Sequence, residues 1–195
     1  LFREDPIRIL RAVKFAARCG LTIEPETYRR MMERRGEIAK CAQARVSEEF
    51  YRLLRAGAAK RSMELLVETD MLEIFAPDLA RALRVGADGQ EGGGEEAALR
   101  RSRLWAYLAA LDRSTEKRST PPSNALILAV ILLPQLRDAL DSRSNGVRDR
   151  GQLVSQALAG ALERLRPSRR DSEVARQILA GVRQALGGRS AGEES

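Results

Sequence analysis

The first 20 residues constrain the fold more than any other part of the sequence, because they have the pattern of one complete amphipathic helix. Asp5 and Pro6 form a strong helix start, with Asp5 predicted as the N-terminal cap and Pro6 as the first helical residue. Gly20 is a typical helix end. Between them, apolar and basic side chains alternate at helical spacing and occupy opposite faces. The apolar face consists of Ile9, Leu10, Val13, Ala16 and Ala17, and the basic face of Arg8, Arg11, Lys14 and Arg18, with Phe15 among the basic residues.

Helical patterns of this kind continue along the chain. Aromatic residues make up only 4% of it, so its core is built from Leu, Ala, Val and Ile, a composition that suits packed helices better than sheets. The sequence therefore predicts an all-α fold of about eight helices. Besides the first helix, we expect helices at 25–34, 47–54 (capped by Ser47), 59–69, 99–111, 123–140, 147–165 and 171–186, with a short helical turn at 37–41 and a short apolar segment at 72–75.

A glycine-rich and acidic stretch lies near the middle of the chain. Residues 86–98 contain the run Gly-Gly-Gly together with several Glu residues, which predicts a flexible, solvated linker. It would separate a first domain, 1–85, from a second helical domain, 99–187. The last residues, 188–195, have the composition of a disordered tail. We also expect Pro134 to kink or end its helix.

The net charge and the residue types that are missing limit the classes of function that the chain can have. The net charge is +7, which favours polyanionic partners. The chain has no His, and this excludes a His-based metal site, a Ser-His-Asp triad and a His-Asp phosphohydrolase. Its two Cys residues show no metal-ligand spacing and suit a reducing compartment. The longest apolar run, 125–133, is too short to cross a bilayer, so we expect a cytoplasmic protein with no membrane partner.

Two acidic residues and an arginine cluster at the start of the first helix. Glu4 and Asp5 offer hydrogen-bond acceptors, and Arg8, one turn later, offers donors. A helix holds such groups at a fixed separation, so together they can match the hydrogen-bonding edge of a nucleobase. The alternative is that Asp5 only caps the helix and Arg8 forms an ordinary surface ion pair.

The segment 2–20 resembles the Glu-Asp-x-x-Arg motif of class II nucleotidyltransferases, the bacterial CCA-adding enzymes and poly(A) polymerase I. The resemblance includes the run Arg-Ile-Leu-Arg-Ala-Val-Lys-Phe-Ala-Ala-Arg and, at 23–27, Ile-Glu-Pro-Glu-Thr. In that family the acidic residue and the arginine select the base of the incoming nucleotide. The resemblance thus implies that Asp5 and Arg8 read the base of ATP. It makes Glu4 and Arg11 the other members of the nucleotide-binding set.

A second segment, 44–54, is similar to the next motif of the family. The resemblance implies that Arg45 and Glu49 brace the helix that carries the base-reading residues. They stand four residues apart and could both face it. The alternative is an ordinary surface pair. The similarity covers residues 1 to about 80, so the first domain would be the neck of such an enzyme and the second its C-terminal body.

Catalysis in this family requires an Asp-x-Asp pair that holds two Mg²⁺ ions in a head domain. The sequence contains no Asp-x-Asp. We therefore expect the chain to bind no Mg²⁺ and to be inactive alone, with its own catalytic domain preceding it. Phe15, Arg11 and Lys14 are expected to face that domain or the substrate phosphates.

Basic residues on two helical segments are the candidates for contacts to RNA phosphates. They are Lys14, Arg18, Arg164, Arg166, Arg169 and Arg170. The alternative for any one of them is a solvated helix face. The expected function is the nucleotide-selecting and RNA-binding part of a poly(A) polymerase that acts on an mRNA or tRNA 3′ end. The same part of a CCA-adding enzyme, or a stand-alone helical RNA-binding adaptor, are the alternatives.

Overall fold

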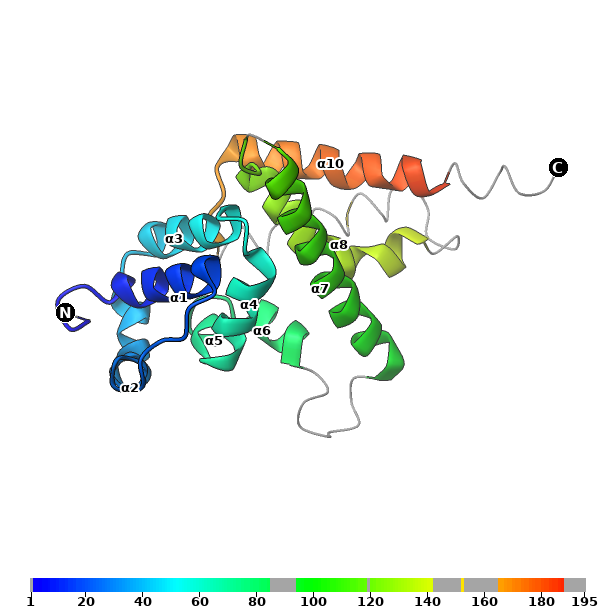
Figure 1. Ribbon diagram of the computed structural model, residues 1–195. Coiled ribbons are helices and arrows are strands. Elements are labelled where there is room, and N and C mark those ends of the chain that lie inside the picture. Colours follow the sequence, from blue (N-terminus) through cyan, green and yellow to red (C-terminus); the bar gives the residue numbers. More distant parts are fainter. Residues whose placement is uncertain (1, 85–93, 119, 142–151, 153–164, 188–195) are drawn as a thin grey trace. The chain divides into compact units, whose positions relative to one another are not determined.

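The computed structural model describes residues 2–84, 94–118, 120–141, 152 and 165–187 (Figure 1). Every regular element among them is a helix, as the composition predicted. The chain divides into two compact units, one of residues 1–122 with 164–166 and one of 123–163 with 167–195. The helix expected to open the second unit packs in the first instead. Of the expected linker, residues 94–98 belong to that helix and 86–93 lie outside the described residues, as does the predicted tail.

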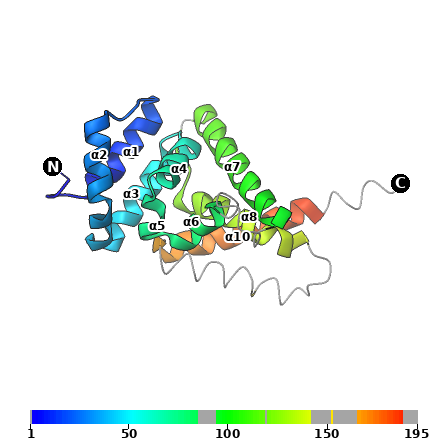
Figure 2. The same ribbon diagram turned by 90° about the horizontal axis from the view of Figure 1, so that it is seen from below.

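The first unit contains eight helical elements in chain order. They are α1 (Ile7–Cys19), α2 (Pro25–Arg34), the short 3-10 helix η1 (Arg35–Lys40), α3 (Gln43–Arg55), α4 (Ala59–Glu68), α5 (Met71–Phe75), α6 (Pro77–Arg84) and α7 (Gly94–Lys117). Helices α1 and α3 lie side by side, and α4 packs against both (Figure 1). Figure 2 shows α2 at the margin of this unit, beside α1.

The core of the first unit lies between α1, α3 and α4. The predicted apolar face of α1 is buried, with Ile9, Leu10 and Val13 fully inaccessible. Phe50 of α3 is also fully buried, and the centre of its ring is 5.5 Å from that of Phe75, in an edge-to-face arrangement. Burial of these side chains fixes which face of α1 remains outside, and that face is the basic one.

The start of α1 differs from the prediction. The helix begins at Ile7, and Pro6 takes the N-terminal cap position, so the capping role assigned to Asp5 is wrong. The reason is tertiary: the Asp5 carboxylate accepts a hydrogen bond from Arg45 of α3. The end of the helix is as expected, because Gly20 adopts the left-handed conformation with φ of 62°.

The other helix boundaries follow local signals in part. Helix α2 begins as predicted, with Pro25 in its first turn and the Glu24 carboxylate accepting hydrogen bonds from the backbone N–H groups of Glu26 and Thr27. Helix α3, however, begins at Gln43, so Ser47 lies inside it and is buried rather than capping it. The burial of Val46 beside it shows that this first turn packs on the core.

Helix α4 is capped by a residue far away in the sequence. The two carboxylate oxygens of Asp112, on α7, accept hydrogen bonds from the backbone N–H groups of Ala59 and Lys60, at 2.6 and 3.0 Å. Gly57, with φ of 80°, makes the preceding turn and has Thr115 of α7 next to it. These contacts hold α7 in the first unit.

The second unit contains α8 (Asn124–Asp141) and α10 (Arg169–Gly187), which pack against each other. Ser123 and Ser168 cap them, each accepting a hydrogen bond from a backbone N–H three residues later. We expected Pro134 to kink the helix or end it early; α8 continues through Pro134, so it does not end there. Most of the helix predicted at 147–165 lies outside the described residues.

Candidate functional site

Three of the predicted site residues meet at the start of α1. Oδ1 of Asp5 accepts a hydrogen bond from Nη2 of Arg45 at 3.2 Å, and Oδ2 lies 3.9 Å from Nε of Arg8. The Asp5 side chain is 24% exposed and that of Arg8 is 43% exposed, so solvent and ligands can reach both. Glu4 is exposed beside them. The cluster presents carboxylate acceptors and guanidinium donors side by side on one accessible surface.

One turn further along, a buried carboxylate gathers three cations. The side chain of Glu49, on α3, is only 6% exposed. Its Oε1 lies 3.3 Å from Nε of Arg11 and 3.2 Å from Nη1 of Arg52, and its Oε2 lies 3.8 Å from Nζ of Lys14. Oε2 is buried and makes no hydrogen bond. Because cations outnumber carboxylates here, the surface above Glu49 remains positive.

Arg45 therefore contacts the segment just before α1, and Glu49 contacts α1 itself. Arg45 contacts Asp5, and Glu49 contacts Arg11 and Lys14. The alternative of a simple pair between Arg45 and Glu49 themselves does not describe their contacts in the structure. Both residues thus contact residues that the sequence analysis named, at the start of α1 and along it.

The sequence analysis did not single out Arg52, which shares Glu49 with Arg11 and also lies 2.9 Å from a carboxylate oxygen of Glu48. Its position three residues after Glu49 was the available signal, since residues at this spacing are neighbours on a helix. Nothing in the sequence, however, separated this pair from many similar ones.

The predicted phosphate-binding residues lie in different parts of the structure. Lys14 and Arg18 lie on the basic face of α1 in the first unit. Arg166 is exposed and has a positive φ of 41°. Arg169 and Arg170 are exposed in the first turn of α10, in the second unit. Arg164 lies outside the described residues.

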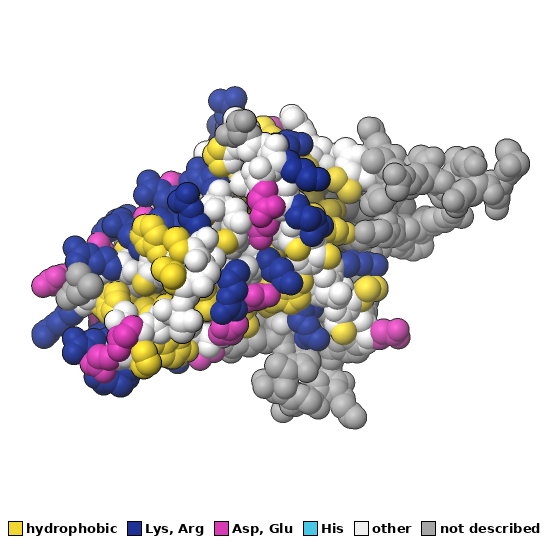
Figure 3. Space-filling model, viewed as in Figure 1, with side chains coloured by type: hydrophobic (Ala, Val, Ile, Leu, Met, Phe, Trp, Pro, Cys, Tyr) yellow, Lys and Arg dark blue, Asp and Glu magenta, His cyan; other side chains and the backbone are white. Residues whose placement is uncertain are grey.

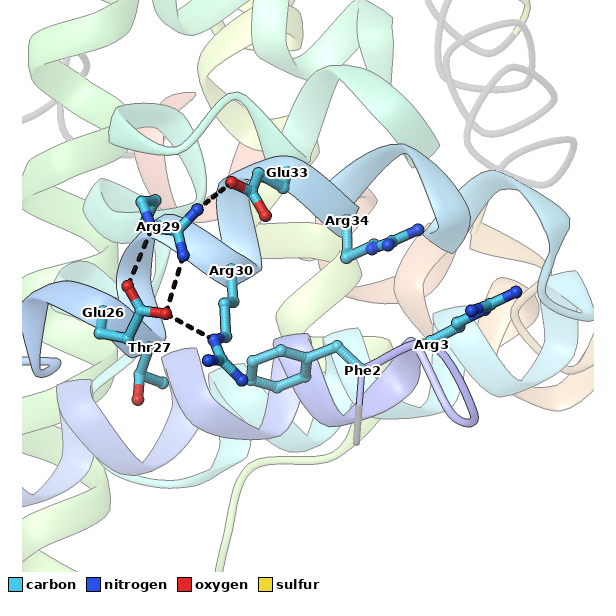
Figure 4. A pocket seen from close by; sticks show the side chains of 8 residues that line it. All are labelled: Phe2, Arg3, Glu26, Thr27, Arg29, Arg30, Glu33 and Arg34. Carbon is cyan, nitrogen blue, oxygen red and sulfur yellow. Dashed lines mark hydrogen bonds and ion pairs between the residues drawn. The ribbon is translucent and has the colours of Figure 1, made fainter.

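A pocket that the sequence analysis missed lies between the N-terminal segment and α2. It has a volume of about 600 Å³ and is lined by Phe2, Arg3, Glu26, Thr27, Arg29, Arg30, Glu33 and Arg34. Figure 4 shows the Phe2 ring beside the Arg30 side chain, and Glu26 between Arg29 and Arg30. The hydrogen bonds from Arg29 and then Arg30 lower the pKa of Glu26 to about 2. Of the four arginines that line the pocket, Arg29 and Arg30 are already paired with carboxylates. This pairing reduces the positive charge that the pocket can offer to an anion.

The described residues also bear on metal binding, thiol chemistry and membrane insertion. In these parts of the chain no three His, Cys, Asp or Glu side chains converge as a metal site requires. Cys19 and Cys41 are free thiols, and burial raises the pKa of Cys41. No helix in the described ranges combines the length and the apolarity needed to span a membrane.

Comparisons with known proteins agree with the motif. Residues 20–83 match a family model described as the probable RNA and SrmB-binding site of polymerase A. A CCA-adding enzyme of Limosilactobacillus fermentum is 29% identical over 169 residues, which is 83% of this chain and 41% of that protein. Poly(A) polymerase I of Escherichia coli O157:H7 is 36% identical over 87 residues, 45% of this chain and 19% of that protein.

A multifunctional CCA protein of Neisseria gonorrhoeae is 38% identical over 80 residues, covering 40% of this chain and 20% of the relative. The chain thus spans less than half the length of each of these relatives. All the relatives named here are poly(A) polymerases or CCA proteins. Over part of its length and at modest identity, the comparisons support the resemblance of this chain to the family of bacterial poly(A) polymerases and CCA-adding enzymes.

Proposed function

We propose that this chain is the nucleotide-selecting and RNA-binding part of a template-independent poly(A) polymerase, which adds AMP to RNA 3′ ends. The observation that carries the proposal is the cluster of Asp5, Arg8 and Arg45 at the start of α1. The proposal is also supported by the family match, since Arg45 lies within residues 20–83, which match a model described as the probable RNA and SrmB-binding site of polymerase A. The chemical step belongs to a catalytic domain with its own Mg²⁺ ions, which would use ATP as the substrate.

The cluster can distinguish bases by the direction of their hydrogen bonds. Adenine and cytosine present an amino donor next to a ring-nitrogen acceptor on the Watson–Crick edge, whereas guanine and uracil present a carbonyl acceptor next to an N–H donor. A carboxylate that accepts and a guanidinium that donates fit the first pattern and oppose the second. Asp5 and Arg8 would therefore select ATP and CTP over GTP and UTP. Arg45 keeps the Asp5 carboxylate aimed at the same surface.

This chemistry alone does not separate the two enzyme classes, because CCA addition also uses CTP and ATP. We place poly(A) addition first because the segments Arg-Glu-Asp-Pro, Phe-Ala-Ala-Arg and Ile-Glu-Pro-Glu-Thr resemble those of poly(A) polymerase I. The RNA would be an mRNA or tRNA 3′ end in the cytoplasm. A stand-alone RNA-binding adaptor is the second candidate, which the basic residues at the start of α10 favour.

The test joins this chain to the upstream part of its own protein and measures extension of a labelled RNA with each nucleoside triphosphate in turn. Long products with ATP alone support poly(A) addition, whereas one to three added nucleotides that end in CCA on tRNA support the alternative. RNA binding without extension, and with no dependence on the nucleotide offered, supports the adaptor.

The variant Arg8→Ala tests base selection directly. We expect it to leave the fold intact, since Arg8 is exposed, and to lower the preference for ATP over GTP by at least about tenfold, the effect of one lost hydrogen bond to a charged group. Arg30→Ala is the matched control, because Arg30 is an exposed arginine on α2. Unchanged selectivity in the Arg8 variant would show that the base-reading assignment is wrong.

A further inference from the structure

One aromatic residue of the first unit is exposed where an aromatic residue is not expected. The Phe15 side chain, on α1, is 54% exposed, although Phe50 and Phe75 of the same unit are buried. The apolar face of α1 already packs on the core without it. An exposed phenylalanine on a helix contributes nothing to that core, so its surroundings must be considered for another use.

Those surroundings are basic. Arg11 and Arg18 stand four residues before and three residues after Phe15, so they are its neighbours along the same helix face. The Nζ of Lys14 lies 5.1 Å from the centre of the Phe15 ring, which is a cation–π distance. We call these four residues, Arg11, Lys14, Phe15 and Arg18, the basic ridge of α1. Figure 3 shows hydrophobic side chains exposed among Lys and Arg side chains over this part of the unit.

The basic ridge contacts α3 through ion pairs, and it retains a net positive charge after these pairs are counted. Glu49 fixes Arg11 and Lys14 from below, at 3.3 and 3.8 Å, and Arg52 shares the same carboxylate. Arg18 forms no ion pair among the described residues. An aromatic face with one cation about one helical turn, or ~5 Å, before it and another about one turn after it is an arrangement that single-stranded nucleic acids recognise.

We propose that Phe15 is a stacking platform for one unpaired base of the RNA 3′ segment, with Arg11 and Arg18 contacting the phosphates on either side and Lys14 holding the ring. This inference rests on the proposed RNA-binding function and deepens it. Phe15 follows Arg8 by two turns, about 10 Å along the helix. The RNA end would therefore lie along α1 and lead to the site where the incoming nucleotide is read.

The ring and the ridge charges favour RNA over a protein partner. A protein surface that only covered an apolar side chain would gain nothing from the cations around it. An RNA strand uses both features, because its bases stack on aromatic rings and its phosphates pair with Lys and Arg. A contact with another protein domain is the competing occupant, and the experiment below separates the two.

The experiment measures binding of the full chain to a labelled single-stranded oligo(A) by fluorescence anisotropy at several salt concentrations. We expect Phe15→Ala to weaken binding about tenfold, the usual effect of losing one base–aromatic stack, and Phe15→Trp to preserve it. Leu21→Ala is the matched control, since Leu21 is an exposed apolar residue (64%) outside the ridge, and its affinity should not change. Arg18→Ala should reduce the slope of log affinity against log salt by about 0.7.

A second measurement identifies the stacked base. A series of RNAs is used, each with one base removed at a different position. The wild-type chain should bind one of these RNAs more weakly than the others, and the Phe15→Ala variant should bind all of them with equal affinity. Equal affinities of the Phe15→Ala and Leu21→Ala variants, or abasic losses that are the same in both backgrounds, would overturn the stacking proposal and leave a protein contact as the reason for the exposed ring. If the wild-type chain bound no RNA, the proposed RNA-binding function would fail and this inference with it.

Discussion

Helices α1 and α2 are both rich in arginine, but they pair their charges in different ways. On α2, Arg29 and Arg30 contact Glu26, and Arg29 also contacts Glu33, so every partner lies within four residues on the same helix. Asp5, just before α1, contacts Arg45, and Arg11 and Lys14 of α1 contact Glu49; these partners lie on α3, 35 to 40 residues away in the sequence.

The difference has a physical consequence. The pairs on α2 lie in solvent, where Coulomb attraction is weak and side chains can rearrange. The contacts of Arg11 and Lys14 join α1 to α3, and both are made to Glu49, whose carboxylate is nearly buried. The same residue types therefore neutralise a surface on α2 and build a positioned cluster on α1. Four experiments can break or sharpen this comparison, beginning with the largest expected effect.

The Glu49→Gln variant should have the largest effect on stability. It removes the carboxylate that Arg11, Lys14 and Arg52 share, and we expect the free energy of unfolding to fall by about 1–3 kcal/mol. Urea denaturation followed by circular dichroism measures this change. The control is Glu33→Gln on α2, for which a change within about 0.5 kcal/mol is expected because its side chain is half exposed. Equal losses for the two variants would remove the distinction between the helices.

The Asp112→Ala variant extends the comparison to a backbone contact. Asp112 caps α4 from α7, and its loss leaves two N–H groups of the first turn without their acceptor. We expect a loss of about 1 kcal/mol, as for other N-terminal caps, and a smaller loss for Asp112→Asn, which retains one acceptor oxygen. The midpoint of urea unfolding reports both variants. Wild-type stability of Asp112→Ala would show that the cap contributes nothing to the unit.

A double-mutant cycle on Asp5 and Arg45 should give a coupling energy smaller than the stability losses expected above. Asp5→Asn, Arg45→Gln and the double variant should yield a coupling energy of about 0.5–1 kcal/mol, because Asp5 is largely shielded although Arg45 is 57% exposed. The corresponding cycle on Glu33 and Arg29 of α2 should give about 0.3 kcal/mol. A larger coupling on α2 than between the helices would reverse the comparison.

The smallest effect concerns the pH dependence of α2. The pKa of Glu26 falls from its ordinary 4.5 to about 2 because Arg29 and Arg30 donate hydrogen bonds to it. Its contribution to stability is therefore complete above about pH 4.5 and is lost as the pH falls towards 2. Glu26→Gln should flatten the stability curve only in this window, which acid titration of the unfolding midpoint measures. A change confined to neutral pH would contradict the assignment.

Local signals predicted much of the fold. The alternation on α1, the Gly20 end and the Glu24-Pro25 start depend on neighbouring residues, and the structure confirms all three. The errors arose where a distant contact competes with a local one. Asp5 was expected to cap its own helix and instead contacts Arg45, and α3 extends four residues upstream of Ser47 because its first turn packs on the core.

The candidate site likewise contains residues that the sequence predicted and contacts that it did not. The residues Asp5, Arg8, Arg45 and Glu49 were named from motifs, but their partners were not, and Arg52 was missed. The pocket beside α2 was also missed, because it joins side chains from two segments that no sequence spacing relates.

The sequence by itself determined that the chain is helical, which face of each early helix is apolar and which family it resembles, because these depend on periodicity and on residues close together along the chain. Only the tertiary structure decided which charges meet and which carboxylate is buried. The physical reason is that hydrogen bonds and ion pairs act over a few ångströms in space. Their partners are set when α1 and α3 pack together, whatever the separation of the residues in the sequence.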